Sequence, residues 1–148
     1  MQISFFLITK LIIILLFSLI LSVQDIKHGE VSVYIQWVSI FCALLCHLIF
    51  ARTEMWIYII SSMLMGAFYF TVRKITREKL GPADVWFGFF QGLFLVPMMI
   101  PLCFGIEALA ALCVMNKKVD RKTFPFIPFM SLGLIITYVI ASVAKQSM

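Results

Sequence analysis

The feature of this chain that most constrains its fold is a succession of long apolar segments separated by short polar ones. Hydrophobic residues make up 63% of its 148 residues and charged residues 13%. A soluble domain of this size has too little interior to bury that much apolar surface. A bilayer supplies the missing apolar solvent, and a helix of roughly 17 to 25 residues crosses it with its backbone hydrogen bonds satisfied. The sequence therefore predicts an all-α polytopic membrane protein.

About six segments are predicted to be transmembrane helices, in a single domain that covers residues 1–148. Pro97 and Pro101 mark the expected turn between the fourth and fifth helices, because proline breaks the helical hydrogen-bond ladder. An alternative with five helices stays open if that region is re-entrant. The predicted segments are Ile3–Val23, Val31–Phe50, Met55–Val72, Val85–Pro97 with an extension toward Pro101, Leu102–Met115 and Phe126–Ala144.

The basic residues are distributed unevenly between the loops. By the positive-inside rule the first, third and fifth loops are predicted to be cytoplasmic, with both termini outside, in the cytoplasmic (inner) membrane. Because these residues lie in short loops and not on one soluble face, the net charge of +5 predicts contact with the lipid bilayer and no nucleic-acid partner. The three loops hold nine of the twelve Lys and Arg residues: Lys27, Arg73, Lys74, Arg77, Lys79, Lys117, Lys118, Arg121 and Lys122.

The four cysteines lie in apolar segments and form no CxxC pair, which argues against a disulfide framework and a zinc site. Cys42 and Cys46 share a helix face with His47 beside them. We interpret them as packing residues, since a free cysteine behaves as a small buried hydrophobe. A metal or haem contact is the alternative, and no cofactor is predicted.

Two of the acidic residues stand where a predicted cytoplasmic loop meets an apolar helix. Asp25 closes the first helix and Asp84 opens the fourth, so the predicted topology places both at one membrane face. Two close, partly desolvated carboxylates share one proton, because both cannot ionise easily. The ionised acid then takes a proton from water while the protonated one polarises a carbonyl, which hydrolyses a peptide bond.

Other interpretations of these acids remain open. Asp84 is also suited to cap its helix, and Asp25 has Lys27 two positions away as an ion-pair partner. A small proton- or cation-coupled transporter is a further alternative, although such proteins usually place their acids near the bilayer midplane. Glu107 stands alone among apolar residues, where it is either buried or at the outer interface.

Three short segments carry a resemblance to a known family. Leu80-Gly81-Pro82-Ala83-Asp84-Val85 resembles the GxGD motif of type IV prepilin peptidases and archaeal preflagellin peptidases. Ser22-Val23-Gln24-Asp25-Ile26-Lys27 resembles the first aspartate site of that family, and Phe124-Pro125-Phe126-Ile127-Pro128-Phe129-Met130 is similar to its PFGPFL segment. The resemblance implies that Asp25 and Asp84 are the catalytic aspartates of an intramembrane aspartic endopeptidase.

The implied substrate is a prepilin-like membrane protein whose leader is cut at the cytoplasmic membrane face, after a Gly and often before a Phe, in a type IV pilus or protein secretion system. Beside the two acids, the candidates for contact with this substrate are Lys27, Gly81, Pro125 and Pro128. The cytoplasmic zinc-cysteine segment of larger family members has no counterpart here. The resemblance is therefore to a short, peptidase-only form, and N-methyltransferase activity is not expected.

The chain also departs from the family pattern. Ala83 replaces the second glycine of GxGD, Trp86 stands where the family commonly has Lys, and Ile127 replaces the glycine of PFGPFL. Val31-Ser32 stands in place of the usual Ile-Pro. These departures keep open a second interpretation, a catalytically weakened relative that serves as a membrane assembly factor. The sequence predicts neither the identity of the substrate nor the oligomeric state.

Overall fold

The computed structural model describes residues 2–115 and 124–147, and over these residues it contains helices and no strands. Five helical stretches are long and apolar enough to cross a membrane, which confirms the prediction of an all-α polytopic membrane protein. The basic residues of the loop between the last two helices lie outside the described residues. The helices are α1 (Gln2–His28), α2 (Val33–Phe50), α3 (Met55–Ile75), α4 (Pro82–Gly92), the short 3₁₀ helix η1 (Pro97–Met99), α5 (Ile100–Met115) and α6 (Ile127–Ser147).

The fourth helix differs from the sequence prediction. It was expected to run from Val85 to Pro97, but α4 begins at Pro82 and ends at Gly92, after 11 residues. At 1.5 Å per residue it is about 16 Å long, against a hydrocarbon core of about 30 Å. Pro82 fixes the early start, because the φ angle of proline suits the first helical position and its missing N–H is not needed there.

The turn between α4 and α5 also lies earlier than predicted. Leu93, Phe94 and Leu95 follow α4 as a buried, non-helical segment, and η1 leads into α5. Pro101 lies in the first turn of α5, where the backbone N–H groups have no partner within the helix in any case. The polypeptide therefore turns inside the bundle, before the two prolines that were expected to mark the hairpin.

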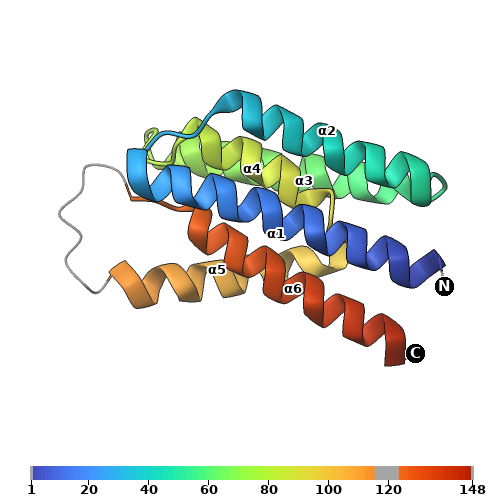
Figure 1. Ribbon diagram of the computed structural model, residues 1–148. Coiled ribbons are helices and arrows are strands. Elements are labelled where there is room, and N and C mark those ends of the chain that lie inside the picture. The colour runs from blue at the N-terminus through green and yellow to red at the C-terminus, as the bar shows by residue number, and fades with distance from the viewer. Residues whose placement is uncertain (1, 116–123, 148) are drawn as a thin grey trace.

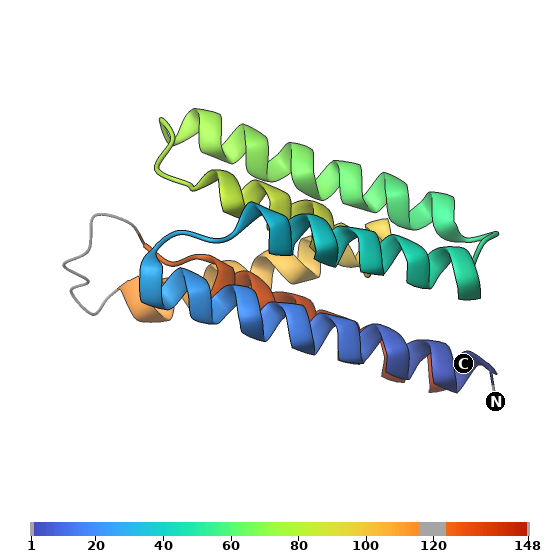
Figure 2. The ribbon, with the colours of Figure 1, turned by 45° about the horizontal axis from the view of Figure 1, so that its top comes forward.

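Successive helices run in alternating directions, so both termini lie at one end of the bundle (Figure 1). The connections α1–α2 and α3–α4 lie at the opposite end, as the second view also shows (Figure 2). Helix α3 packs along α4, and α6 packs along both α1 and α5. At Gly92 the backbones of α4 and α3 approach so closely that an added Cβ would collide with the backbone of Ser62.

The interior of the bundle is mostly apolar and aromatic, with a few buried polar side chains. Lys10 interrupts the first apolar segment, yet only 2% of its surface is exposed. Its ammonium group lies 4.3 Å from the ring centre of Phe6 and 3.9 Å from that of Tyr58, an arrangement that stabilises a cation away from water. His47 bonds through Nδ1 to the carbonyl oxygen of Ala43 at 2.8 Å. In the described part of the chain no group of three or more His, Cys, Asp or Glu residues is placed to hold a metal ion.

Candidate active site

A cavity of about 470 Å³ lies at the end of the bundle that carries the α1–α2 and α3–α4 connections. Asp25 reaches it from the last turns of α1 and Asp84 from the first turn of α4. Both residues are nearly buried, with 9% and 6% of their surface exposed. The structure therefore brings the two acids, 59 positions apart in the sequence (84 − 25), to the wall of one cavity.

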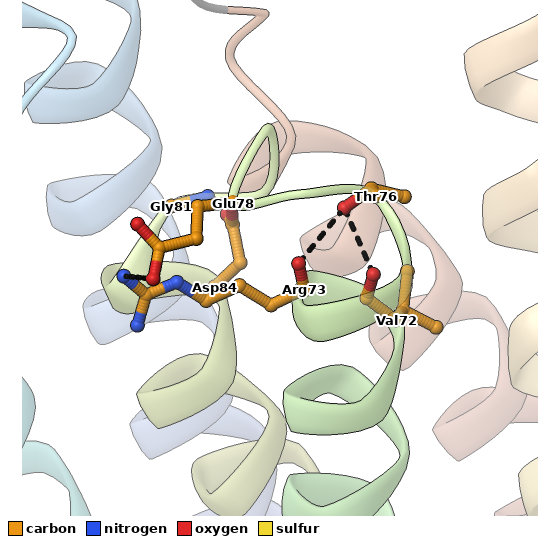
Figure 3. A network of polar contacts seen from close by, with 6 residues as sticks. All are labelled: Val72, Arg73, Thr76, Glu78, Gly81 and Asp84. Atoms are coloured by element: carbon orange, nitrogen blue, oxygen red, sulfur yellow. Dashed lines mark hydrogen bonds and ion pairs between the residues drawn. The ribbon is translucent and has the colours of Figure 1, made fainter.

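Asp84 is held by the start of its own helix. The helix cap is Gly81, and Asp84, the third residue of α4, accepts a hydrogen bond from the Gly81 N–H through Oδ2 at 2.9 Å. Figure 3 shows Gly81 and Asp84 beside the loop that carries Glu78. The alternative in which Asp84 is the N-cap of its helix is wrong, because Gly81 occupies that position and Asp84 bonds back to it from the third position of α4. This bond fixes one oxygen of the carboxylate at the cavity wall.

The loop that precedes Gly81 is tight and partly strained. Thr76 closes α3 by donating its hydroxyl to the carbonyl oxygen of Val72 at 2.8 Å. Arg77 and Glu78 then have φ angles of 53° and 63°, a left-handed conformation that costs a residue other than glycine about 1 to 3 kcal/mol. An ion pair of 3.8 Å between Arg73 and Glu78 spans the same turn (Figure 3). This short connection keeps the start of α4 beside the end of α3.

Asp25 is held by a different helix. Its Oδ2 accepts a hydrogen bond of 3.1 Å from the backbone N–H of Ile127, the first residue of α6. A helix start carries partial positive charge and unpaired N–H groups, so it favours a carboxylate. Asp25 forms no ion pair with Lys27; among the described residues the ion pair is the one between Arg73 and Glu78. The bond to Ile127 also keeps the Phe124–Phe126 segment at the cavity.

The surroundings of Asp84 favour the protonated form of its carboxyl group. Burial, and after it the nearby negative charge of Asp25, together raise the pKa of Asp84 to about 7, against the lowering effect of the Gly81 N–H. Helix α4 is not one of the five membrane spans. At neutral pH a substantial fraction of Asp84 therefore carries a proton, while the two acids face the same space.

The four candidate substrate contacts separate into two pairs. Gly81 and Pro125 line the cavity, whereas Lys27 and Pro128 are not among its lining residues. Lys27 is exposed on the last turn of α1, and Pro128 is half-buried in the first turn of α6. Gly81 has an extended conformation, with φ of −66°, and a Cβ there would lie 3.3 Å from Oδ2 of Asp84. A side chain at position 81 would therefore press against that carboxylate.

The cavity is also lined by residues that the sequence did not indicate as catalytic or as substrate contacts. Among them, Gln36 carries the clearest signal in the sequence, because a lone glutamine in an apolar helix needs a hydrogen-bond partner when it is buried. Trp86 packs against Trp37 of α2, with ring centres 4.8 Å apart. The remaining lining residues are Gly29, Glu30, Val31, Val33, Glu78, Lys79, Pro82, Ala83 and Phe124.

A third acid, Glu107 of α5, lies in a separate buried cluster. Only 2% of Glu107 is exposed, which answers the question left open by the sequence. Tyr69 donates its hydroxyl to Oε2, while the Gln91 amide and, at 3.1 Å, the Cys103 thiol donate to Oε1. A Cβ at Gly133 of α6 would collide with the Glu107 side chain. Glu107 is not among the residues that line the Asp25–Asp84 cavity.

Comparisons of the chain with protein families, with curated proteins and with solved structures found no match.

Proposed function

We propose that this protein is an intramembrane aspartic endopeptidase that cleaves the leader of a prepilin-like membrane protein. The observation that carries the proposal is the placement of two nearly buried carboxylates, from different helices, on the wall of one cavity. The resemblance of the segments around Asp25, Asp84 and Pro125 to the prepilin peptidase motifs supports the same chemistry. All three segments contribute residues to this cavity.

The proposed reaction uses the two acids in opposite protonation states. Asp25, ionised and held by the Ile127 N–H, takes a proton from a water molecule that attacks the carbonyl carbon of the scissile bond. Asp84, protonated, donates its proton to the carbonyl oxygen. Collapse of the tetrahedral intermediate breaks the C–N bond; Asp25 then gives its proton to the leaving amine, and the intermediate hydroxyl returns a proton to Asp84. The dyad thus recovers its starting state.

The position of the cavity suits a substrate whose leader lies at the membrane surface. The cavity lies at a bundle end, where the apolar helix of a prepilin-like protein emerges from the bilayer into its polar leader. Glu30 and Glu78 lie on its wall and complement a basic leader, with Lys79 beside them. The charge asymmetry of the loops favours a cytoplasmic orientation for this end in the inner membrane.

The departure of Ala83 from the GxGD pattern is compatible with activity. Ala83 is the second residue of α4, and the residues other than glycine with positive φ in the described chain are Arg77 and Glu78. A glycine is therefore not required at this position by the backbone conformation. The methyl group of Ala83 costs no left-handed strain next to Asp84.

The direct test is cleavage by the purified protein in detergent, followed by mass spectrometry. The probe is a synthetic peptide with a basic leader, a Gly–Phe junction and the first turns of an apolar helix. Wild type should cut after the Gly, and Asp84→Asn, with the same fold by circular dichroism, should not. The proposal would be overturned if the folded wild type cleaved neither a panel of such peptides nor the pilin-like proteins encoded nearby. That result favours the non-catalytic assembly factor.

A further inference from the structure

Gln36 of α2 connects the wall of the cavity to the segment that carries Asp84. Its Nε2 donates a hydrogen bond of 2.8 Å to the carbonyl oxygen of Ala83, the residue before Asp84. Gln36 is 1% exposed and lines the same cavity as both acids. A carbonyl oxygen only accepts hydrogen bonds, so this contact fixes which end of the amide is the NH₂ group.

The other end of the same amide is unusual. Gln36 Oε1 is buried and accepts no hydrogen bond within the described part of the chain. A buried acceptor without a donor costs about 1 to 3 kcal/mol, and such atoms in a folded protein call for a specific explanation. A donor on the same cavity wall explains this atom, and Asp84, which follows the Ala83 that Gln36 binds, is such a donor when its carboxyl is protonated.

The proton shared by the dyad meets this requirement. We propose that Gln36 is the positioning residue of the dyad: Nε2 anchors the Ala83 carbonyl, and Oε1 accepts a hydrogen bond from the protonated carboxyl of Asp84. Gln36 thereby assigns the shared proton to Asp84 and leaves Asp25 as the base. This inference rests on the proposed function for its catalytic meaning, but the hydrogen bond itself exists independently of any substrate.

Several other groups face Asp84 and act on its protonation. Helix α2 contributes Gln36 to the cavity wall and no charged residue. Since a hydrogen bond from the neutral carboxyl favours the protonated form, its loss lowers the pKa of Asp84. The neighbouring groups, which stay unchanged in the variants below, are Asp25 of α1, Glu30 of the α1–α2 loop, Glu78 and Lys79 of the α3–α4 loop, and Tyr69 of α3.

The first experiment is the pH profile of peptide cleavage by wild type and Gln36→Met. The high-pH limb, where Asp84 loses its proton, should move to lower pH by about 0.5 to 1 unit, the equivalent of one hydrogen bond. Gln36→Asn, which withdraws the amide by one methylene, should move it in the same direction. Gln24→Met is the matched control, because the Gln24 amide accepts the Ser32 N–H at 3.2 Å and is not among the cavity residues. Its limb should not move.

The second experiment needs no substrate and separates this inference from the proposed function. Carboxyl ¹³C labelling of aspartate, with Asp84→Asn for assignment, gives the titration of Asp84 in the intact protein by NMR. A lower midpoint in Gln36→Met or Gln36→Asn, with Gln24→Met unchanged, supports the inference even if no peptide is cleaved. An unchanged midpoint in folded Gln36 variants, or a uniform loss of cleavage at every pH, overturns it, because a purely structural role predicts that result.

Discussion

The cavity acids and Glu107 are all buried carboxylates, yet their surroundings differ in kind. Asp25 and Asp84 each accept a backbone N–H from a helix start and border an open space of about 470 Å³. Glu107 receives three side-chain donors, from Tyr69, Gln91 and Cys103, and packs against Gly133. The first arrangement leaves room for a reacting molecule, whereas the second ties helices α3, α4, α5 and α6 together.

This difference separates two uses of a buried acid in a membrane protein. Charged groups in a bilayer are expensive and are kept for function or for pairing. A carboxylate surrounded by its own donors holds a structure, because each donor would be left unpaired without it. A pair of carboxylates beside a cavity can exchange protons with a molecule bound there. The predictions below test this division, beginning with the largest expected effect.

The first prediction contrasts the acids in the cleavage assay. Asp25→Asn and Asp84→Asn should each reduce cleavage by roughly three orders of magnitude or more, and the double variant should be little worse, because residues that share one step are not additive. Glu107→Gln, which keeps the shape of the side chain, should retain most of the activity. If folded Glu107→Gln lost as much cleavage activity as the Asp25 and Asp84 variants, the distinction between cavity acids and a structural acid would not hold.

The second prediction concerns stability, for which a substitution of Glu107 should have a larger effect than a substitution of Asp84. Glu107→Leu leaves the Tyr69 hydroxyl without its acceptor and removes one of the two oxygen acceptors of the Gln91 amide, so it should lower the free energy of unfolding by about 3 kcal/mol. Below pH 3.8, where Asp84 is neutral in the folded and the unfolded protein, Asp84→Asn retains an oxygen for the Gly81 N–H and should change the free energy of unfolding by less than about 1 kcal/mol. Denaturant unfolding in detergent, followed by tryptophan fluorescence, measures both. Equal effects of the two substitutions would contradict the division.

The third prediction is the pH dependence of the cavity. The pKa of Asp84 is raised from 3.8 to about 7, so cleavage should fall as the pH rises through about 7 and the shared proton is lost. The sign for stability follows from the same shift: the fold favours neutral Asp84, and this contribution is complete below pH 3.8 and disappears as the pH rises to about 7. Comparison of wild type with Asp84→Asn across this range isolates the effect. A difference that is constant with pH would argue against a shared proton.

The smallest expected effect is at Ala83. Because Ala83 lies in α4 without positive φ, Ala83→Gly relieves no strain and should cost about 0.5 to 1 kcal/mol of stability, with cleavage nearly unchanged. Ala83→Val should impair cleavage, since a branched side chain crowds a cavity wall beside Asp84. Both expectations are tested by measuring the cleavage activity of wild type, Ala83→Gly and Ala83→Val in one detergent. A marked gain in Ala83→Gly would show that the site is strained after all.

The sequence anticipated the parts of the structure that follow from hydrophobic length and charge. The long helices α1, α2, α3, α5 and α6 follow apolar segments, and the positions of Asp25 and Asp84 at helix ends placed them at one end of the bundle. The extent of α4 was missed because an apolar segment continues past Gly92 without remaining helical; burial of Leu93 and Phe94 explains its hydrophobicity. Apolar composition does not distinguish a helix from a buried irregular segment.

The hydrogen-bond partners of the buried polar side chains could not be predicted from the sequence. Gln36 meets Ala83 and Gln91 meets Met130 across 47 and 39 positions, so their partners depend on how the helices pack. Lys27 illustrates the reverse case, since its closeness to Asp25 in the sequence produces no ion pair. Local spacing predicts contacts along a helix face, whereas contacts between helices require the fold.

The short fourth helix also bears on how the protein is made. Eleven residues of α4 are too few to partition into the bilayer alone, so α4 enters it together with α3, to which it is closely apposed at Gly92. Asp25 receives its hydrogen bond from Ile127, which the ribosome adds about a hundred residues later. The hydrogen bond that holds Asp25 in place therefore forms only after the chain has reached the start of α6.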